Sequence, residues 1–256
     1  MKKVLKTILL ILVAFFLFSM VLGFLRNCTD KNEEETVKTE KEITTVSLVD
    51  SGYNDLEVKT YVGATPGAEL RFVGDGKGTL RASDGGTLTV KNMTVIDGTS
   101  DAGIGIYESY LRFGGKLYFE NCTFQNSICL TTEASAEFVN CKFVSNQSRY
   151  YSVWVADGSA SFTDCEFVGF RGLKVNEFDA TYQIDKLSET LEDVISVSVV
   201  NCRFELTEKP GVSLDGFTTP ENTTVSIKDS VFVGCEVYEK DEVFEITFSE
   251  SGNVVE

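Results

Sequence analysis

The sequence contains no histidine, only three prolines and one tryptophan, and few basic residues. In 256 residues, 23 Lys and Arg stand against 39 Asp and Glu, which gives a formal net charge of −16. Without histidine, an imidazole base and a His-ligated metal site are excluded. The deficit of basic residues argues against a nucleic-acid binder, because such proteins need a basic surface that displaces phosphate counterions. We therefore expect no nucleic acid among the partners.

The charge is unevenly distributed along the chain. Residues 1–28 contain four basic residues and no acid, whereas residues 29–256 carry −20, from 39 acids and 19 bases. Between Lys6 and Arg26 lie 19 uncharged, mostly apolar residues. This is about the length of a helix that crosses the hydrocarbon core of a membrane. Basic residues at its N-terminal end predict that the rest of the chain is exported.

Residues 1–28 are therefore predicted to be a signal peptide or a membrane anchor, and in either case an N-terminal hydrophobic helix. Val21 and Gly23 supply the small residues of a cleavage site. The apolar run, however, exceeds the roughly 7–15 residues usual in a signal peptide. Both alternatives stay open, and the membrane is a partner if residues 7–25 are not cleaved. The expected location is extracellular or at the cell surface.

An acidic segment follows the apolar one. Residues 29–42 contain six acids, three bases and a single apolar residue, Val37. Such a composition buries too little apolar surface to offset the entropy lost on folding, so this segment is predicted to be a stalk or linker. The folded domain is expected to comprise residues 43–256.

A repeat runs through this domain. Four copies contain cysteine and two degenerate copies flank them: LYFENCTF (117–124), AEFVNCKF (136–143), ASFTDCEF (160–167), VSVVNCRF (197–204), LTVKNMTV (88–95) and VSIKDSVF (225–232). Apolar residues at alternate positions indicate a half-buried strand. The Asn or Asp that follows tolerates a left-handed turn, and the apolar phase then resumes. Each unit is predicted to be a strand, a one-residue corner and a second strand.

Units of this size must stack on one another to bury their apolar faces. Parallel stacking would bring equivalent residues of neighbouring units to about 4.8 Å, so that they form ladders. The predicted ladder residues are Asn92, Asn121, Asn140, Asp164, Asn201, Asp229, Cys122, Cys141, Cys165 and Cys202. A structural column explains these cysteines better than redox or zinc chemistry, because the chain has no C-x-x-C pair. The disulfide state of Cys129 and Cys235, outside the column, stays open.

With these coils of the N-C-x-F type, residues 60–250 resemble the right-handed parallel β-helix repeat proteins of the pectin-lyase-like superfamily. The resemblance implies an all-β fold, a right-handed parallel β-helix (solenoid) of about seven to eight coils. It also implies that loops on one side of the coils frame a groove for polysaccharide. The fold alone does not specify a reaction, since it carries lyases, hydrolases, adhesins and spacers.

Long intervals between the corners predict insertions at 97–115, 170–194 and 206–224. We expect the first two, together with residues 148–154, to line the groove. Tyr150, Tyr151 and Trp154 are candidates for ligand binding, because aromatic rings stack on sugars. In a strand, Tyr150 and Trp154 would share one face and Tyr151 the other, so one of these sets is expected in the core.

Arg171 and Lys174 are the catalytic candidates, because lyase action on a uronate needs a base such as Arg or Lys. The alternative is that both are solvated loop cations. We expect no metal site and no cofactor, although acids such as Asp97 and Asp101 leave weak Ca²⁺ binding open.

The function we expect is that of an exported, surface-displayed binding or adhesion module without enzymatic activity, with a glycan or a surface protein as its partner. The alternative is a divergent polysaccharide lyase that uses Arg or Lys chemistry, and a structural spacer also stays open.

Overall fold

The computed structural model describes residues 41–48, 52–74, 78–99, 110–131, 133–146, 150–175, 195–208, 210–214, 223–240 and 246–256. The compact unit to which they belong is Lys41–Glu256. The predicted N-terminal hydrophobic helix lies outside the described residues. Within the ranges just given, no helix has the length and apolar character needed to cross a membrane.

The described residues form twenty-five strands in three sheets, and every pair of neighbouring strands among them is parallel. Sheet A contains β1 (Ile43–Leu48), β4 (Glu69–Gly74), β7 (Thr94–Thr99), β10 (Thr123–Phe124), β13 (Lys142–Ser145), β16 (Glu166–Gly169), β19 (Arg203–Leu206), β22 (Val231–Val233) and β25 (Val254–Val255). Sheet B contains β2 (Tyr53–Leu56), β5 (Thr79–Ala82), β8 (Leu111–Phe113), β11 (Ile128–Leu130), β14 (Val153–Val155), β17 (Leu173–Val175), β20 (Val212–Leu214) and β23 (Tyr238–Lys240). Sheet C contains β3 (Thr60–Val62), β6 (Thr87–Lys91), β9 (Lys116–Glu120), β12 (Ser135–Val139), β15 (Ser159–Thr163), β18 (Ser196–Val200), β21 (Thr224–Lys228) and β24 (Thr247–Ser251).

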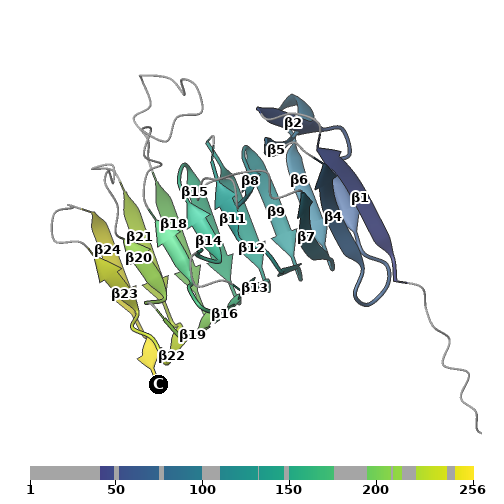
Figure 1. Cartoon of the computed structure of the whole chain (residues 1–256). Helices are drawn as coiled ribbons and strands as arrows, with labels where there is room; N and C mark the ends of the chain where they lie inside the picture. Colours follow the sequence, from purple (N-terminus) through teal and green to yellow (C-terminus); the bar gives the residue numbers. More distant parts are fainter. Residues whose placement is uncertain are drawn as a thin grey trace, which may run out of the picture. The chain divides into compact units, whose positions relative to one another are not determined.

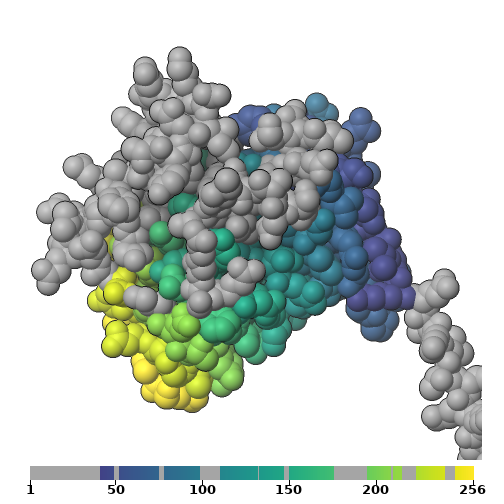
Figure 2. All heavy atoms as spheres, in the orientation of Figure 1, coloured from purple at the N-terminus to yellow at the C-terminus, as the bar shows by residue number. Residues whose placement is uncertain are grey.

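Each strand pairs with the strands three places before and after it in the chain. The chain therefore visits sheets A, B and C in turn and returns to sheet A one rung further along, which defines a parallel β-helix (Figure 1). The described strands make eight three-stranded coils, and β25 begins a ninth. The coils follow one another as adjacent bands of colour in Figure 2. The predicted all-β solenoid of seven to eight coils is confirmed.

The corners between sheet C and sheet A lie where the repeat predicts them. Asn92, Asn121, Asn140, Asp164, Asn201 and Asp229 all have positive φ, between 51° and 56°. Asn and Asp adopt this left-handed conformation at the least cost among residues with a Cβ atom. Gly252, with φ 68°, makes the equivalent corner between β24 and β25. One left-handed residue at each corner thus turns the chain while the apolar phase is kept.

The core consists of stacked phenylalanines. In one column, neighbouring rings of Phe124, Phe143, Phe167, Phe204 and Phe232 lie 4.5–4.9 Å apart and within 13° of parallel. Phe119, Phe138 and Phe162 form a second column, which meets the first edge to face. Each such contact contributes about 0.5–1.5 kcal/mol beyond the burial of apolar area.

A column of buried, unbridged cysteines lies directly after the corners and contains Cys122, Cys141, Cys165 and Cys202. Each thiol lies within hydrogen-bond reach of backbone carbonyl groups, as Cys122 Sγ does at 3.3 Å from the carbonyl oxygen of Val90. Cys129 and Cys235 are also free thiols. The cysteines therefore fill space and satisfy backbone groups at the corner.

Candidate functional site

The outer face of sheet C is rich in small hydroxyl side chains. In a β-strand alternate residues point to opposite faces, and on this sheet the inward positions of β6 to β21 are apolar. The first two outward positions of the last four strands are Ser or Thr and form two columns: Ser159, Ser161, Ser196, Ser198, Thr224, Ser226, Thr247 and Ser249. The backbone pairing thus lays out a regular grid of hydroxyl groups, with neighbours about 4.8 Å apart along each column.

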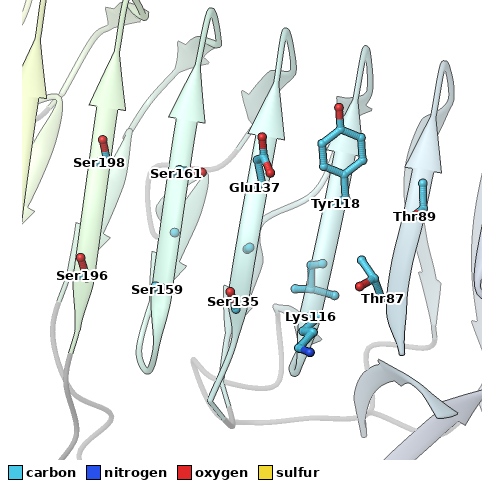
Figure 3. Close-up of a pocket in the computed structure, with 13 residues that line it drawn as sticks. Thr87, Thr89, Lys116, Tyr118, Ser135, Glu137, Ser159, Ser161, Ser196 and Ser198 are labelled. Atoms are coloured by element: carbon cyan, nitrogen blue, oxygen red, sulfur yellow. The ribbon is translucent and has the colours of Figure 1, made fainter. Parts of the chain in front are cut away.

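A shallow groove of about 570 Å³ lies on this face (Figure 3). Its polar lining comes from five successive strands, β6 to β18, and consists of Thr87, Thr89, Lys116, Tyr118, Ser135, Glu137, Ser159, Ser161, Ser196 and Ser198. The groove is shallow and widely open to solvent, so a ligand would lie along the strands and not in an enclosed pocket. Because hydroxyl groups both donate and accept hydrogen bonds, the floor of the groove suits a ligand that is itself rich in hydroxyl groups.

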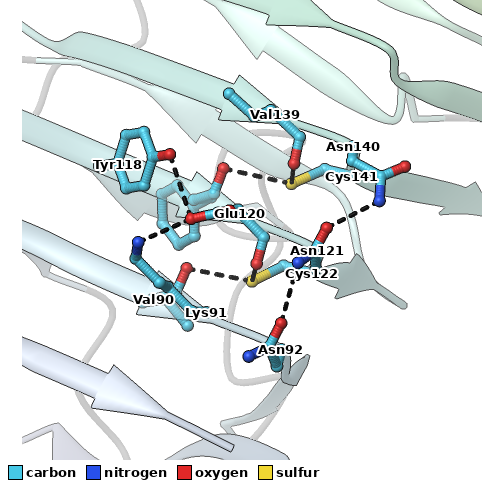
Figure 4. A network of polar contacts seen from close by, with 11 residues as sticks. Val90, Lys91, Asn92, Tyr118, Glu120, Asn121, Cys122, Val139, Asn140 and Cys141 are labelled. Carbon is cyan, nitrogen blue, oxygen red and sulfur yellow. Dashed lines mark hydrogen bonds and ion pairs between the residues drawn. The ribbon is translucent and has the colours of Figure 1, made fainter.

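Tyr118 is the aromatic residue of the groove, and a polar network fixes its position (Figure 4). Its hydroxyl donates to Glu120 Oε2 at 3.2 Å, and the same oxygen accepts from Lys91 Nζ at 2.7 Å. Lys91 Nζ also lies 5.0 Å from the centre of the Tyr118 ring. The hydrogen bond from Lys91 lowers the pKa of Glu120, and the carboxylate in turn raises the pKa of Lys91. Desolvation, together with the bond to Glu120, raises the pKa of Tyr118, so its hydroxyl stays protonated.

The corner residues beside this network form a ladder of side-chain hydrogen bonds (Figure 4). Asn121 Nδ2 donates to Asn92 Oδ1 at 3.0 Å, and Asn140 Nδ2 donates to Asn121 Oδ1 at 2.7 Å. Further along, Asn201 Nδ2 donates to Asp164 Oδ1 at 2.5 Å. These bonds join neighbouring coils at the edge of sheet C and hold its strands in register.

The aromatic candidates Tyr150, Tyr151 and Trp154 gather at the outer face of sheet B, not on the groove. Trp154, 8% exposed, packs with Tyr110, Cys129 and Ala156 in a cluster separate from the main core, and Tyr150 lies against it. The Tyr110 ring contacts those of Tyr150 and Trp154 edge to face, at 5.5 and 5.6 Å. The hydroxyl oxygen of Tyr110 accepts from the backbone N–H of Tyr151. Tyr151 and Trp154, one from each alternation set, are therefore both buried, and Tyr150 is partly buried.

The catalytic candidates Arg171 and Lys174 belong to the same cluster. Arg171 Cζ lies 5.3 Å from the ring centre of Tyr151, and Lys174 Nζ lies 5.8 Å from it and 5.2 Å from that of Trp154. The structure thus brings all five predicted site residues together. Arg112 lies on the same column, two strands before Trp154, and is buried.

Burial dominates the titration of this cluster. It raises the pKa of the Cys129 thiol well above its ordinary value, although Arg112 and Lys174 act in the opposite direction. Burial likewise raises the pKa of Tyr110 well above its usual range. Both groups therefore stay neutral at physiological pH. The Nε atom of Arg171 is also buried, and it has no hydrogen-bond partner among the described residues.

The predicted groove between the insertions is largely outside the described residues, since 100–109, 147–149 and 176–194 are not described. Asp101 lies there too, so the pair it was expected to make with Asp97 is outside the description. Within the described ranges, no three Cys, Asp or Glu side chains come together in an arrangement that holds a metal ion.

The groove on sheet C was missed at the level of sequence, although a signal for it exists. Ser or Thr occurs at both outward positions in TLT (87–89), SAS (159–161), SVS (196–198), TVS (224–226) and TFS (247–249). These triplets open the same repeat units that define the corners.

The fold defines this chain as a parallel β-helix protein with a hydroxyl-rich exposed face. Comparison with family models, with curated proteins and with solved structures gives no match.

Proposed function

We propose that this protein is an exported, surface-displayed β-helix module that binds a neutral carbohydrate along the outer face of sheet C without cleaving it. The observation that carries the proposal is the groove of Ser and Thr hydroxyls with Tyr118 on β9, the second of its five strands. Sugar hydroxyls pair with such groups, and an aromatic ring offers apolar area to a sugar face. The pectin-lyase-like family relationship and the surface location are part of the same proposal.

The charge of the protein supports a neutral ligand. The chain carries −16, so a polyanionic glycan would meet long-range repulsion. The first two outward columns from β15 to β24 have no charged side chain, whereas Lys228 lies in the third column and Lys116 and Glu137 lie nearer Tyr118. A neutral chain that crosses β15 to β24 would encounter the same pair of hydroxyls on each strand.

A glycan array with neutral and uronate polymers tests the proposal. Tyr118→Ala is expected to weaken binding about tenfold, the equivalent of one aromatic contact. Ser161→Arg, which fills the groove, is expected to abolish binding. Thr123→Arg is the matched control, because Thr123 is a partly exposed hydroxyl residue on β10 of sheet A. Binding that survives Ser161→Arg, or that is lost equally in Thr123→Arg, contradicts the proposal.

A polysaccharide lyase is the second candidate. The approach of Arg171 and Lys174 to Tyr151 favours it, because such groups supply the base and the charge stabilisation that proton abstraction next to a carboxylate needs. If this candidate is right, incubation with uronate polymers produces the ultraviolet absorbance of unsaturated uronates, and Arg171→Ala abolishes it. If no uronate polymer gives this absorbance, the lyase candidate is wrong.

A further inference from the structure

The large hydrophobic side chains that remain exposed mark the two ends of the β-helix. Among the described residues, they are Ile43, Tyr53, Val58, Val62, Val254 and Val255, with exposed fractions between 37% and 60%. The first four belong to the coil formed by β1, β2 and β3, and the last two form β25. The described coils between the two ends expose no large hydrophobic side chain.

The first coil also presents open strand edges. Each of β1, β2 and β3 is the outermost described strand of its sheet. The N–H of Glu69 donates to the carbonyl oxygen of Glu42, so the even-numbered residues of β1 bond to β4. In a parallel ladder the alternate residues then direct their N–H and C=O groups away from that neighbour. On β1 these are Ile43, Thr45 and Ser47, and on β3 they are Thr60 and Val62.

The two ends differ in how they resist pairing. Charged residues and prolines on an edge strand prevent it from pairing with other molecules. β1 (ITTVSL) and β3 (TYV) have neither, and the one charged residue of β2, Asp55, is paired with Arg81 of β5. At the opposite end, Glu239 lies on β23, Glu250 on β24 and Glu256 directly after β25. The first coil is therefore the end that permits association.

We propose that the first coil is a dimer interface at which a second copy of this chain continues the three sheets. A two-fold axis through β2 places β2 antiparallel to β2 of the second copy. Because β1 and β3 flank β2 in the coil, the same axis places β1 against β3 of the second copy. In the register with Ile43 opposite Val62, Thr45 lies opposite Thr60, and all four residues direct their backbone groups to the open edge. This single two-fold rotation thus gives hydrogen-bond partners to the open edges of β1, β2 and β3. It also places the exposed side chain of Ile43 beside that of Val62 of the second copy.

A head-to-tail arrangement is blocked by β25. If β2 and β3 of another copy continued β23 and β24, β1 of that copy would have to follow β22 in sheet A. That position is occupied by β25, which pairs with β22. The interface between two first coils therefore closes as a dimer and does not extend into a fibre.

The sequence around the first coil favours a second copy as the occupant. Residues 41–62 carry a net charge of −2, from Lys41 and Lys59 against Glu42, Asp50, Asp55 and Glu57, and β1 itself has no charged residue. The repulsion between two copies at this coil comes from these few charges, which salt screens. The sequence before β1, residues 29–40, has a single apolar residue, Val37, with which to cover the exposed side chains. Screening by salt is expected to strengthen the dimer.

Light scattering on the purified full chain tests the interface. The wild type is expected to have twice the protein mass of one chain at high concentration, with a dimer fraction that rises with salt. Ile43→Lys and Thr45→Pro are expected to be monomeric. The proline removes an N–H that faces away from β4, so the coil itself is spared. Val254→Lys, the same kind of change at the other end, is the control and is expected to remain dimeric. Circular dichroism checks that each variant retains its β-structure.

Cross-linking tests the symmetry. In the double variant Ile43→Cys, Val62→Cys, mild oxidation is expected to yield a disulfide-linked dimer, which the wild type does not form under the same conditions. A wild type that stays monomeric at every concentration overturns the proposal. This is the result expected if residues 1–40 cover the open edges of their own chain. Dissociation by Val254→Lys instead of Ile43→Lys overturns it as well. Absence of the cross-link in a dimer excludes the two-fold arrangement.

Discussion

Asn140 and Asn121 are joined across neighbouring coils by a hydrogen bond of 2.7 Å between their side-chain amides, although 19 residues separate them in the chain. The ladder continues to Asn92 through a second amide bond. No side-chain hydrogen bond joins Asn140 to the next corner residue, Asp164, because Asp164 has no amide N–H to donate to the Asn140 oxygen. Asp164 instead accepts from Asn201. The ladder is therefore two separate segments.

Asp164→Asn is expected to join these segments. The new amide donates to Asn140 and still accepts from Asn201, and the left-handed corner is retained because Asn tolerates it. We expect a gain of about 0.5–1 kcal/mol in the free energy of unfolding, the net value of one hydrogen bond. Urea denaturation measures it. Asn121→Asp removes a donor from an intact segment and should lower the free energy of unfolding. If both variants changed this free energy in the same direction, the ladder would be contradicted.

Phe143→Ala is expected to be severely destabilising. The ring lies between Phe124 and Phe167, at 4.9 and 4.8 Å, and is fully buried. The expected loss is about 3–5 kcal/mol, from removed apolar contact and the cavity left behind. Phe232→Ala is the comparison, because among the described rings Phe232 stacks on Phe204 alone, and it lies near the end of the core. A smaller loss in the free energy of unfolding for Phe143→Ala than for Phe232→Ala would show that the stack does not act as described.

The fall in the free energy of unfolding at acidic pH is expected to depend on Glu69. Its carboxylate is largely buried and accepts from Lys41 and Arg71, and the bond from Lys41 is the main reason that its pKa is lowered. A pKa that is lower in the folded state contributes stability above the unfolded pKa, and this contribution is lost as pH falls through the folded value. Glu69→Gln should lower the free energy of unfolding by about 2 kcal/mol at neutral pH.

The difference in free energy of unfolding between the wild type and Glu69→Gln should become smaller as the pH falls below about 4. Protonation then removes the charge of Glu69 in the wild type, and the variant has none. Urea denaturation at a series of pH values measures this convergence. A constant difference between Glu69→Gln and the wild type from neutral to acidic pH would rule out the ion pairs as its source.

Trp154 provides a direct probe of the cluster on sheet B, because it is the only tryptophan in the chain. At 8% exposure beside Tyr110 and Cys129, its fluorescence is expected to be blue-shifted and poorly quenched by acrylamide in the folded protein. Trp154→Ala should cost about 3 kcal/mol or more in the free energy of unfolding, since a large buried side chain is removed. Emission at the wavelength of a solvated indole in the folded protein would contradict the burial.

The repeat predicted stacked units of two strands and a corner, and its resemblance to parallel β-helix proteins supplied the fold. A chain bends at Asn121 and then resumes its apolar phase at Cys122 and Phe124, and that local pattern is legible because the strand period is two residues. The six corners and the parallel stacking follow from it. The alternation argument expected one of the sets of Tyr151 and Trp154 in the core, and Val153, which shares a face with Tyr151, lies there. Strand period alone did not predict that Trp154 is buried too, because its burial comes from the cluster with Tyr110 and Cys129 on the outer face of sheet B.

The sequence by itself determined the net charge, the absence of histidine and therefore of imidazole chemistry, the coil repeat and the identity of the corner residues. These depend on composition and on neighbours along the chain. Only the tertiary structure decided which side chains meet: that Arg171 and Lys174 approach Tyr151, that the Ser and Thr triplets form one face, and that the first coil has open edges. The physical reason is that these relationships arise between coils, where residues 19 to 37 places apart become neighbours through backbone pairing.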